Sequence, residues 1–248
     1  MDLTVIGAGP AYSDRVGSAG ACYLLRAQAE ALVLDIGQGA FPGLVRRVEP
    51  SRLQAIVVSH LHPDHFIDLV PLRHYLRYQR QPPERVRVVA PEALPARLDG
   101  LHGTAGFCAA SLDVTAISTG TVQLGPFVLQ AARVTHDGDS YGYRVSTGTG
   151  PGLVYSGDCA VADDLRPLIR PGDTLLCEVS FGPGPVPPGG HHLDGTMVGA
   201  LAAATQPGRV LLTHLQMGFD RDQTVAAVRA RFDGPVELVD PGFETGIA

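Results

Sequence analysis

The chain has 248 residues, a formal net charge of -6 and 45% apolar residues, enough for the core of a single domain spanning residues 1–248. The acidic balance argues against polynucleotide binding, which normally needs a basic surface to displace phosphate counterions. No apolar run approaches a membrane span, and the N-terminus lacks a signal core, so we expect a cytoplasmic protein. The four cysteines form no C-x-x-C pair, which fits reduced thiols.

Short β-rich runs alternate with helix-like stretches along the chain. We expect strands at Leu3–Gly7, Cys22–Arg26, Ala31–Asp35, Ala55–His60, Val86–Ala90, Val114–Ile117, Val122–Val134, Tyr141–Ser146, Leu153–Ser156, Thr174–Val179 and Val210–Leu215. We expect helices at Phe66–Tyr78, Asp163–Ile169, Gly195–Thr205 and Arg221–Phe232. Many strands with interspersed helices predict a sheet-on-sheet core with helices outside.

A glycine-rich segment, Gly7-Ala8-Gly9, follows the first expected strand and looks like the opening of a dinucleotide-binding fold. That fingerprint needs a third small residue, where Tyr12 stands, and a helix whose N-terminus holds the pyrophosphate. The residues that follow do not have the pattern of such a helix. We therefore interpret the segment as a turn over a cleft, in which the backbone N–H of Gly9 is a candidate for contacting a substrate phosphate.

The most informative segment is the run of six residues from His60 to His65, which holds three histidines and one aspartate directly after an apolar strand-like run. Alternate side chains of an extended segment share one face, so His60 and His62 can point at one ion. Asp64 and His65 follow and can reach a second ion nearby. Imidazole nitrogens and carboxylate oxygens are donors that zinc accepts. Three of the nine histidines fall in this window, so chance clustering is a poor explanation.

Three further ligand-type residues each end an apolar, strand-like run: His136, Asp158 and His214. Strand ends at one edge of a sheet present their side chains to a common cleft. Any one of these residues alone would more often be a hydrogen-bonded structural residue. Their shared position at strand ends favours a metal site.

The order of these motifs resembles that of the metallo-β-lactamase superfamily, and the resemblance runs through essentially the whole chain. It implies an α/β fold, a four-layer αβ/βα sandwich with two metals at one edge of the sheets. The ligand sets that it implies are His60, His62 and His136 for the first metal and Asp64, His65 and His214 for the second, with Asp158 bridging the two.

A more specific likeness lies in the segment Ser140–Arg144 after His136, which is similar to ribonuclease Z and its phosphodiesterase relatives. Those relatives carry a His-Ser-Thr-type motif whose histidine is thought to protonate the leaving group. His192 stands at the corresponding place here, although the two residues after it, Leu193 and Asp194, depart from the motif. His191 remains an alternative for the same role.

Three other residues, and Asp64 in a second role, are candidates for supporting functions. Glu178 is a candidate for orienting the His192 imidazole, and a surface acid at a strand end is the equally supported alternative. Asp35 is a candidate for accepting the second N–H of a metal-bound imidazole. Asp64 could also orient the attacking water or accept its proton, and Ser140 is a candidate for substrate binding.

The expected function is hydrolysis of a small phosphodiester, such as a cyclic nucleotide or a cyclic sugar phosphate, with two divalent ions per chain. Zinc is the first expectation, with manganese or iron as alternatives. A tRNA 3′-end endonuclease is disfavoured because only Val145 to Ser156 separates the third motif from the fourth, which leaves no room for a tRNA-gripping arm. Hydrolysis of a thioester, lactone or β-lactam and a non-catalytic metal sensor remain alternatives, and a homodimer remains open.

Overall fold

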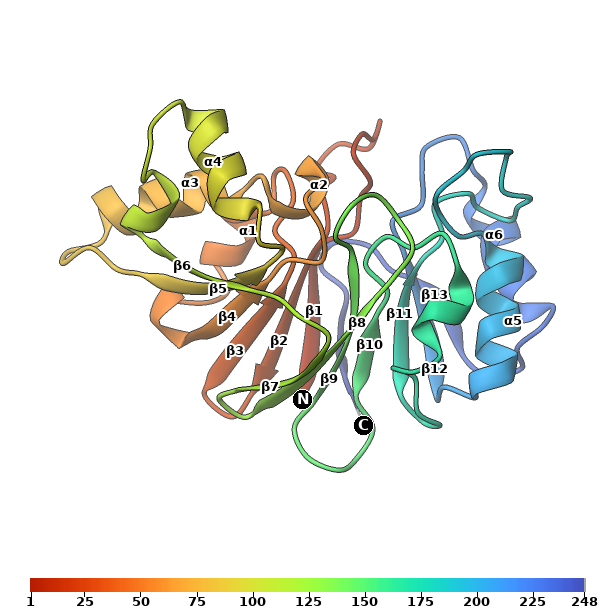
Figure 1. The fold of residues 1–248 in the computed structure, drawn as a ribbon. Helices are drawn as coiled ribbons and strands as arrows, with labels where there is room; N and C mark the ends of the chain where they lie inside the picture. Colours follow the sequence, from red (N-terminus) through yellow and green to blue (C-terminus); the bar gives the residue numbers. More distant parts are fainter. Residues whose placement is uncertain (248) are drawn as a thin grey trace.

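Most central strands are buried on both faces, so each sheet must be covered on two sides. The computed structural model, which describes residues 1–247, meets this requirement with two seven-stranded sheets packed face to face and helices on both outer faces (Figure 1). The N-terminus lies at the lower edge of the sheets in this view. No helix among residues 1–247 is long and apolar enough to cross a membrane.

The first sheet is parallel from β3 to β6 and antiparallel elsewhere. Its strand order is β14 (Glu244–Gly246), β1 (Asp2–Gly7), β2 (Cys22–Ala27), β3 (Glu30–Leu34), β4 (Leu53–Val57), β5 (Val86–Ala90) and β6 (Leu112–Ala116). Its outer face carries α1 (Phe41–Val45), α3 (Leu69–His74), a π-helical turn (Tyr75–Gln79) and α4 (Leu94–His102), and α2 (Pro63–Phe66) lies at its upper edge (Figure 1).

The second sheet is parallel from β10 to β13 and antiparallel from β7 to β10. Its strand order is β13 (Val236–Leu238), β12 (Arg209–Thr213), β11 (Thr174–Glu178), β10 (Leu153–Tyr155), β9 (Tyr141–Ser146), β8 (Phe127–Arg133) and β7 (Gly120–Leu124). Its outer face is covered by α5 (Gly195–Thr205) and α6 (Arg221–Arg229). Short 3-10 turns lie at Pro50–Arg52, Cys108–Ala110 and Ala162–Leu165.

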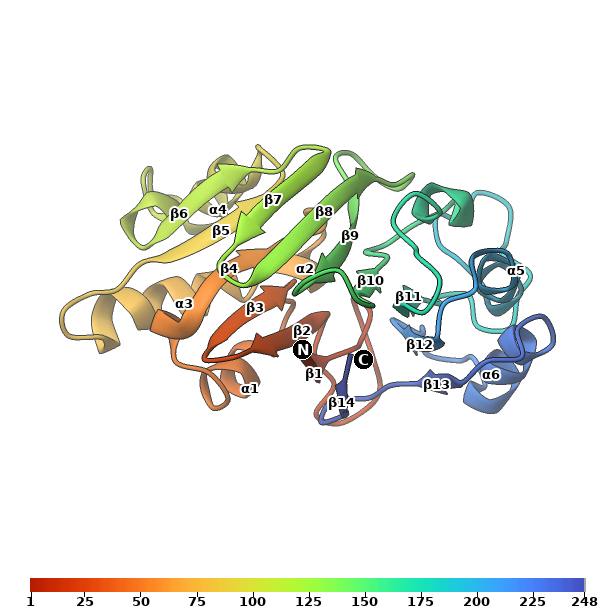
Figure 2. The ribbon, with the colours of Figure 1, turned by 90° about the horizontal axis from the view of Figure 1, so that it is seen from below.

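Three apolar clusters fill the spaces between these layers. The central one joins the inner faces of both sheets, for example Leu25 and Tyr23 from β2 with Leu129 from β8 and Tyr143 from β9. One outer cluster lies under α1–α4 and the other under α5 and α6. The view from below shows the same layering (Figure 2). The predicted four-layer αβ/βα sandwich is confirmed, whereas the single-domain boundary stays a prediction.

Several predicted elements differ from the structure for local reasons. The run Val122–Val134 is a hairpin because Gly125, with φ of 56°, turns the chain between β7 and β8. The predicted helix Phe66–Tyr78 is interrupted because Pro71 lacks the N–H that a continuous helix would donate to the carbonyl of Ile67. The predicted helix Asp163–Ile169 contains only the 3-10 turn Ala162–Leu165.

Four elements were not predicted: α1, α4, β13 and β14. Helix α4 buries only Leu94 and Leu98, so its apolar pattern is weak. The segment after β1 contains no helix, which confirms the rejection of a dinucleotide-binding motif. It is instead a long loop that projects above the upper edge of the sheets (Figure 1).

Candidate metal centre

All seven predicted ligands lie where strands end at one edge of the two sheets. His60, His62, Asp64 and His65 follow β4, and the last two belong to the short helix α2, which Pro63 begins. The others follow three strands of the second sheet: His136 after β8, Asp158 after β10 and His214 after β12. The fold therefore brings together residues that are up to 154 positions apart in the sequence.

The first cluster consists of His60, His62, His136 and Asp158, whose donor atoms all lie within 4.8 Å of one another. His136 Nε2 is 3.3 Å from His62 Nδ1 and 3.8 Å from Asp158 Oδ2. His60 Nε2 is 3.6 Å from the same carboxylate oxygen. Four donors at these distances can surround one ion.

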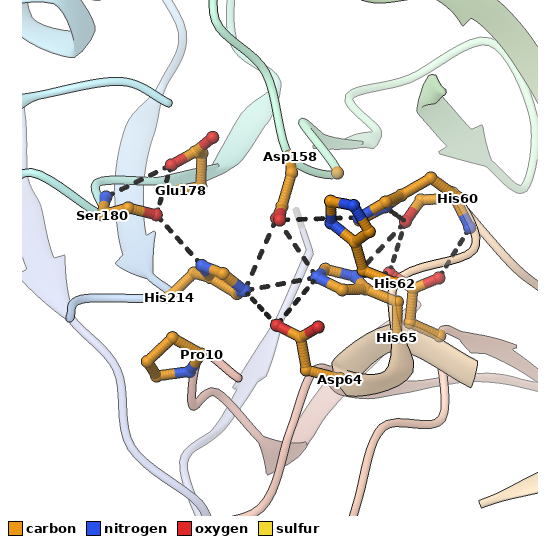
Figure 3. Close-up of polar contacts among 12 residues, drawn as sticks. Pro10, His60, His62, Asp64, His65, Asp158, Glu178, Ser180 and His214 are labelled. Carbon is orange, nitrogen blue, oxygen red and sulfur yellow. Dashed lines mark hydrogen bonds and ion pairs between the residues drawn. The ribbon is translucent and has the colours of Figure 1, made fainter. Parts of the chain in front are cut away.

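The second cluster consists of Asp64, His65, His214 and Asp158, again within 4.8 Å (Figure 3). His65 Nε2 and His214 Nε2 lie 3.2 and 3.5 Å from Asp158 Oδ1. His214 Nε2 is also 3.2 Å from Asp64 Oδ2. Asp158 thus turns Oδ2 toward the first cluster and Oδ1 toward the second, which is the arrangement of a bridging carboxylate.

Hydrogen bonds to the outer ring nitrogens fix three of these imidazoles. Asp35 Oδ2 lies 2.8 Å from His65 Nδ1, which leaves His65 Nε2 for an ion. Ser59 donates its hydroxyl to Asp35 and lies 3.1 Å from His60 Nδ1, so it can accept that N–H. The backbone carbonyl of His191 lies 2.8 Å from Nδ1 of His136. The predicted role of Asp35 therefore has matching geometry.

His214 is oriented through a hydroxyl and a carboxylate. Ser180 donates its hydroxyl to Glu178 Oε2 at 2.6 Å and lies 3.0 Å from His214 Nδ1, where it can accept the ring N–H (Figure 3). His62 is turned the other way, with its Nε2 3.4 Å from Asp137 Oδ2 and its Nδ1 toward the cluster. Ser59, Ser180 and Asp137 were not predicted, since their only sequence signal is proximity to ligand-type residues.

Burial and mutual charge shift the ionisation of the cluster. Burial disfavours the charged form of Asp158, but His214, His65 and His60 outweigh it and hold the pKa of this carboxyl well below its usual range. Burial also opposes charging of His65, yet Asp158 and Asp35 raise its pKa well above the usual value. Burial and the neighbouring His65 lower the pKa of His60 well below the usual value for histidine.

Two buried atoms show that the donor set fits a divalent cation. His60 Nε2 and Asp158 Oδ1 are shielded from solvent and have no hydrogen-bond partner within residues 1–247. Buried polar atoms are rarely left unpaired, and an ion is one of the partners that satisfies them. Nitrogen and carboxylate donors in sets of four suit zinc and neighbouring divalent ions.

A third group of side chains lies at the margin of both clusters. Glu178 is buried, so the alternative of a surface acid is wrong, and its Oε1 lies 3.0 Å from His192 Nδ1. Burial opposes charging of His192, but Glu178 and Asp158 raise its pKa to about 9. The side chain of His192 is 18% exposed, and its Nδ1 lies 3.8 Å from Asp158 Oδ2.

His191 and the residues after His192 have other contacts. The His191 ring is 58% exposed and its Nδ1 lies 3.3 Å from Asp137 Oδ1, and His191 belongs to neither cluster. Asp194 caps α5 by accepting the N–H of Met197. Asp194, where this chain departs from the His-Ser-Thr-type motif, therefore anchors the helix that follows His192.

The two predicted substrate contacts are engaged within the protein. The N–H of Gly9 donates to the Ala19 carbonyl at 2.8 Å, so this group is not free for a phosphate. The buried Ser140 donates its hydroxyl to the Asp137 carbonyl at 2.9 Å. Ser140 thus holds the loop that carries His136 and Asp137.

Comparisons with known proteins agree with this arrangement. A family model described as "Beta-lactamase superfamily domain" matches residues 33–215. The uncharacterized protein ML1173 of Mycobacterium leprae is 35% identical over 227 residues, covering 89% of this chain and 80% of that protein. YhfI of Bacillus subtilis, named a probable metallo-hydrolase, is 23% identical over 98% of both chains.

Solved structures show the same fold. The crystal structure of YhfI from Bacillus subtilis, a metallo-β-lactamase fold protein, matches with a TM-score of 0.88 over 99% of both chains. The short form of human tRNase Z matches at 22% identity with a TM-score of 0.77 over 100% of both chains. A diphosphatase of the PhnP family matches at 16% identity with a TM-score of 0.77, covering 100% of this chain and 98% of that one.

The fold and the His/Asp clusters define a metallo-hydrolase. Because the family model spans residues 33–215, the chain belongs to the β-lactamase superfamily.

Proposed function

We propose that this protein hydrolyses small phosphodiesters with two bound divalent ions, zinc in the first instance. His60, His62 and His136 would hold one ion, Asp64, His65 and His214 the other, and Asp158 both. Two ions at such a site supply a nucleophilic hydroxide from water and offset charge on the phosphoryl oxygens. The names of two structural neighbours, a tRNase Z and a PhnP-family diphosphatase, support phosphoryl chemistry.

The observation that carries the proposal is the Glu178–His192 pair beside the bridging carboxylate. Departure of an alkoxide requires a proton, and an imidazole is suited to donate it. Glu178 holds Nδ1 of His192 at 3.0 Å, which fixes the ring and leaves Nε2 as the donor. A thiolate departs without a proton, so hydrolysis of a thioester gives no comparable reason for an imidazole held in this way beside the ligand-type residues.

Small substrates are favoured over tRNA by the connection between two strands. β9 ends at Ser146 and β10 begins at Leu153, so the loop between them is a short turn. The net charge of -6 also opposes a polynucleotide. Turnover of bis(p-nitrophenyl) phosphate, with a thioester and a β-lactam in parallel, tests the substrate class after zinc reconstitution. Preference for either comparison substrate would reject the proposal.

The role of His192 is tested by the leaving group. His192→Ala should retain its metals and lose roughly two to four orders of magnitude in kcat with a cyclic nucleotide, whose leaving group is an alkoxide. The loss should be much smaller with bis(p-nitrophenyl) phosphate, because p-nitrophenolate departs without a proton. His191→Ala is the matched control and should change little. An equal loss with both leaving groups would remove the proton-donor role.

A further inference from the structure

A cleft of about 730 Å³ opens beside the second cluster, within the size range of small-molecule sites. One wall is the β1–β2 loop and the other is the segment from His214 to Phe219, while Asp240 lies in its polar lining. Pro10 and His214 both line this cleft, and Figure 3 shows them beside each other. The cleft and the second cluster therefore share His214.

Met217 and Phe219 give the cleft an apolar wall. Their side chains are 47% and 36% exposed, although both are large and apolar. The Phe219 ring is fixed from behind: it meets Phe181 edge-on at 6.5 Å and covers Gly182, where an added Cβ would lie 2.6 Å from the ring. A ring held in place with part of its surface open is suited to contact a planar aromatic group.

Arg15 and Arg221 face Asp240 in the polar part of the cleft, which also includes Ser13, Asp14, Ser18 and Gln216. Asp240 accepts two bonds from Arg221, at 2.6 and 3.1 Å, and one from Arg15 at 3.1 Å. Within residues 1–247 the Arg15 guanidinium makes only that bond, so most of its N–H groups remain free for a ligand. A planar group with acceptors on its edge matches this combination of donor and aromatic wall.

The position of the cleft identifies which part of the substrate it would hold. Its lining includes His214 but neither His192 nor any ligand-type residue of the first cluster. A leaving group must lie near its proton donor, and His192 is held by Glu178 and Ser180, neither of which lines the cleft. The ester group that stays on phosphorus then extends into the cleft, past His214.

We propose that this cleft binds an aromatic or heteroaromatic group retained on the phosphorus, with Met217 and Phe219 as its wall and Arg15 as its donor. The assignment of the group as retained rests on the proposed phosphodiesterase function. The binding preference for an aromatic group does not depend on it.

Phosphonates test the binding step because their C–P bond is not hydrolysed. Isothermal titration calorimetry of the zinc-loaded protein should show phenylphosphonate binding about tenfold more tightly than methylphosphonate. Met217→Ala and Phe219→Ala should each reduce that ratio toward one while leaving methylphosphonate affinity unchanged. Leu101→Ala, which removes a 58% exposed side chain on α4, is the control and should keep the ratio. Equal affinities in the unmodified protein, no binding of either phosphonate, or an unchanged ratio in both variants would overturn the proposal.

Turnover separates the two proposals. Phenyl p-nitrophenyl phosphate should have a higher kcat/KM than methyl p-nitrophenyl phosphate, and Phe219→Ala should remove the advantage. Equal losses for both esters would overturn the assignment to the retained group. If neither ester is hydrolysed but the phosphonate ratio persists, the phosphodiesterase function fails and the aromatic cleft stands.

Discussion

Replacing Asp173 by asparagine should destabilise the fold without touching the metal centre. Asp173 lies directly before β11, at the opposite end of that strand from Glu178. Its carboxylate receives a two-pronged contact from Arg144, at 2.7 and 2.8 Å, and the N–H groups of Gly152 and Arg170 at 2.7 and 2.9 Å. Both partners of this ion pair are buried.

The expected cost follows from leaving one charge without its partner. The asparagine side chain would keep the shape but turn an amide toward the Arg144 guanidinium, and removing one member of a buried pair costs about 3–5 kcal/mol. For a chain of this length that corresponds to a fall in Tm of about 10 °C. Asp163→Asn is the matched control, because the Asp163–Arg166 pair is exposed and should contribute less than about 1 kcal/mol.

Urea unfolding of both variants measures the difference, and its pH dependence has a defined sign. Burial opposes the charged form of Asp173, but the bonds from Arg144, Gly152 and Arg170 outweigh it and lower its pKa. A lowered pKa contributes stability that is complete above the unfolded value of about 3.9 and is lost as pH falls through the folded value. The deficit of Asp173→Asn should therefore be full at neutral pH and shrink below about pH 4. A deficit no larger than that of Asp163→Asn would refute the reasoning.

Two further predictions concern metal content, measured after loading with zinc and desalting. The unmodified protein should hold two ions per chain, and Asp158→Ala should lose both, because the two oxygens of Asp158 face different clusters. Retention of both ions would show that Asp158 does not bridge them. Gly37→Ala should lose about one ion. The added Cβ would lie 1.9 Å from the Asp64 backbone carbonyl oxygen, so Asp64 must move and its carboxylate with it. Gly100→Ala, which meets nothing within 4 Å, should keep both, and full occupancy in Gly37→Ala would show that the loop adapts.

The sequence was sufficient to predict which ligand-type residues gather at one edge because strand ends impose a regular pattern. His136, Asp158 and His214 each close an apolar run, and parallel strands bring such ends to one edge. The partners that orient the imidazoles could not be predicted in the same way. Ser180 reaches His214 across 34 positions, and the His191 carbonyl reaches His136 across 55, so only the folded chain reveals them.

Short elements were harder to predict than the site. Helix α4 has a weak apolar pattern, and β14 is a three-residue edge strand that exists only because it pairs with β1. Arg144 ends the segment Ser140–Arg144, whose pattern indicates only a likeness to ribonuclease Z and its phosphodiesterase relatives. Its guanidinium neutralises Asp173 away from the metal edge.

The donor cluster is held in place by the protein core. Asp35 adopts φ of 59°, which is unfavourable for a residue with a side chain, and its carboxylate accepts bonds from Ser59, His65 and Tyr155. Ser59 and His65 come from the first sheet's edge, whereas Tyr155 comes from β10 in the second. Tyr143 of β9 likewise donates to the Val58 carbonyl at 2.8 Å. These buried bonds join the two sheets directly beneath the candidate ligands. Packing of the two sheets therefore also fixes the position of one cluster relative to the other.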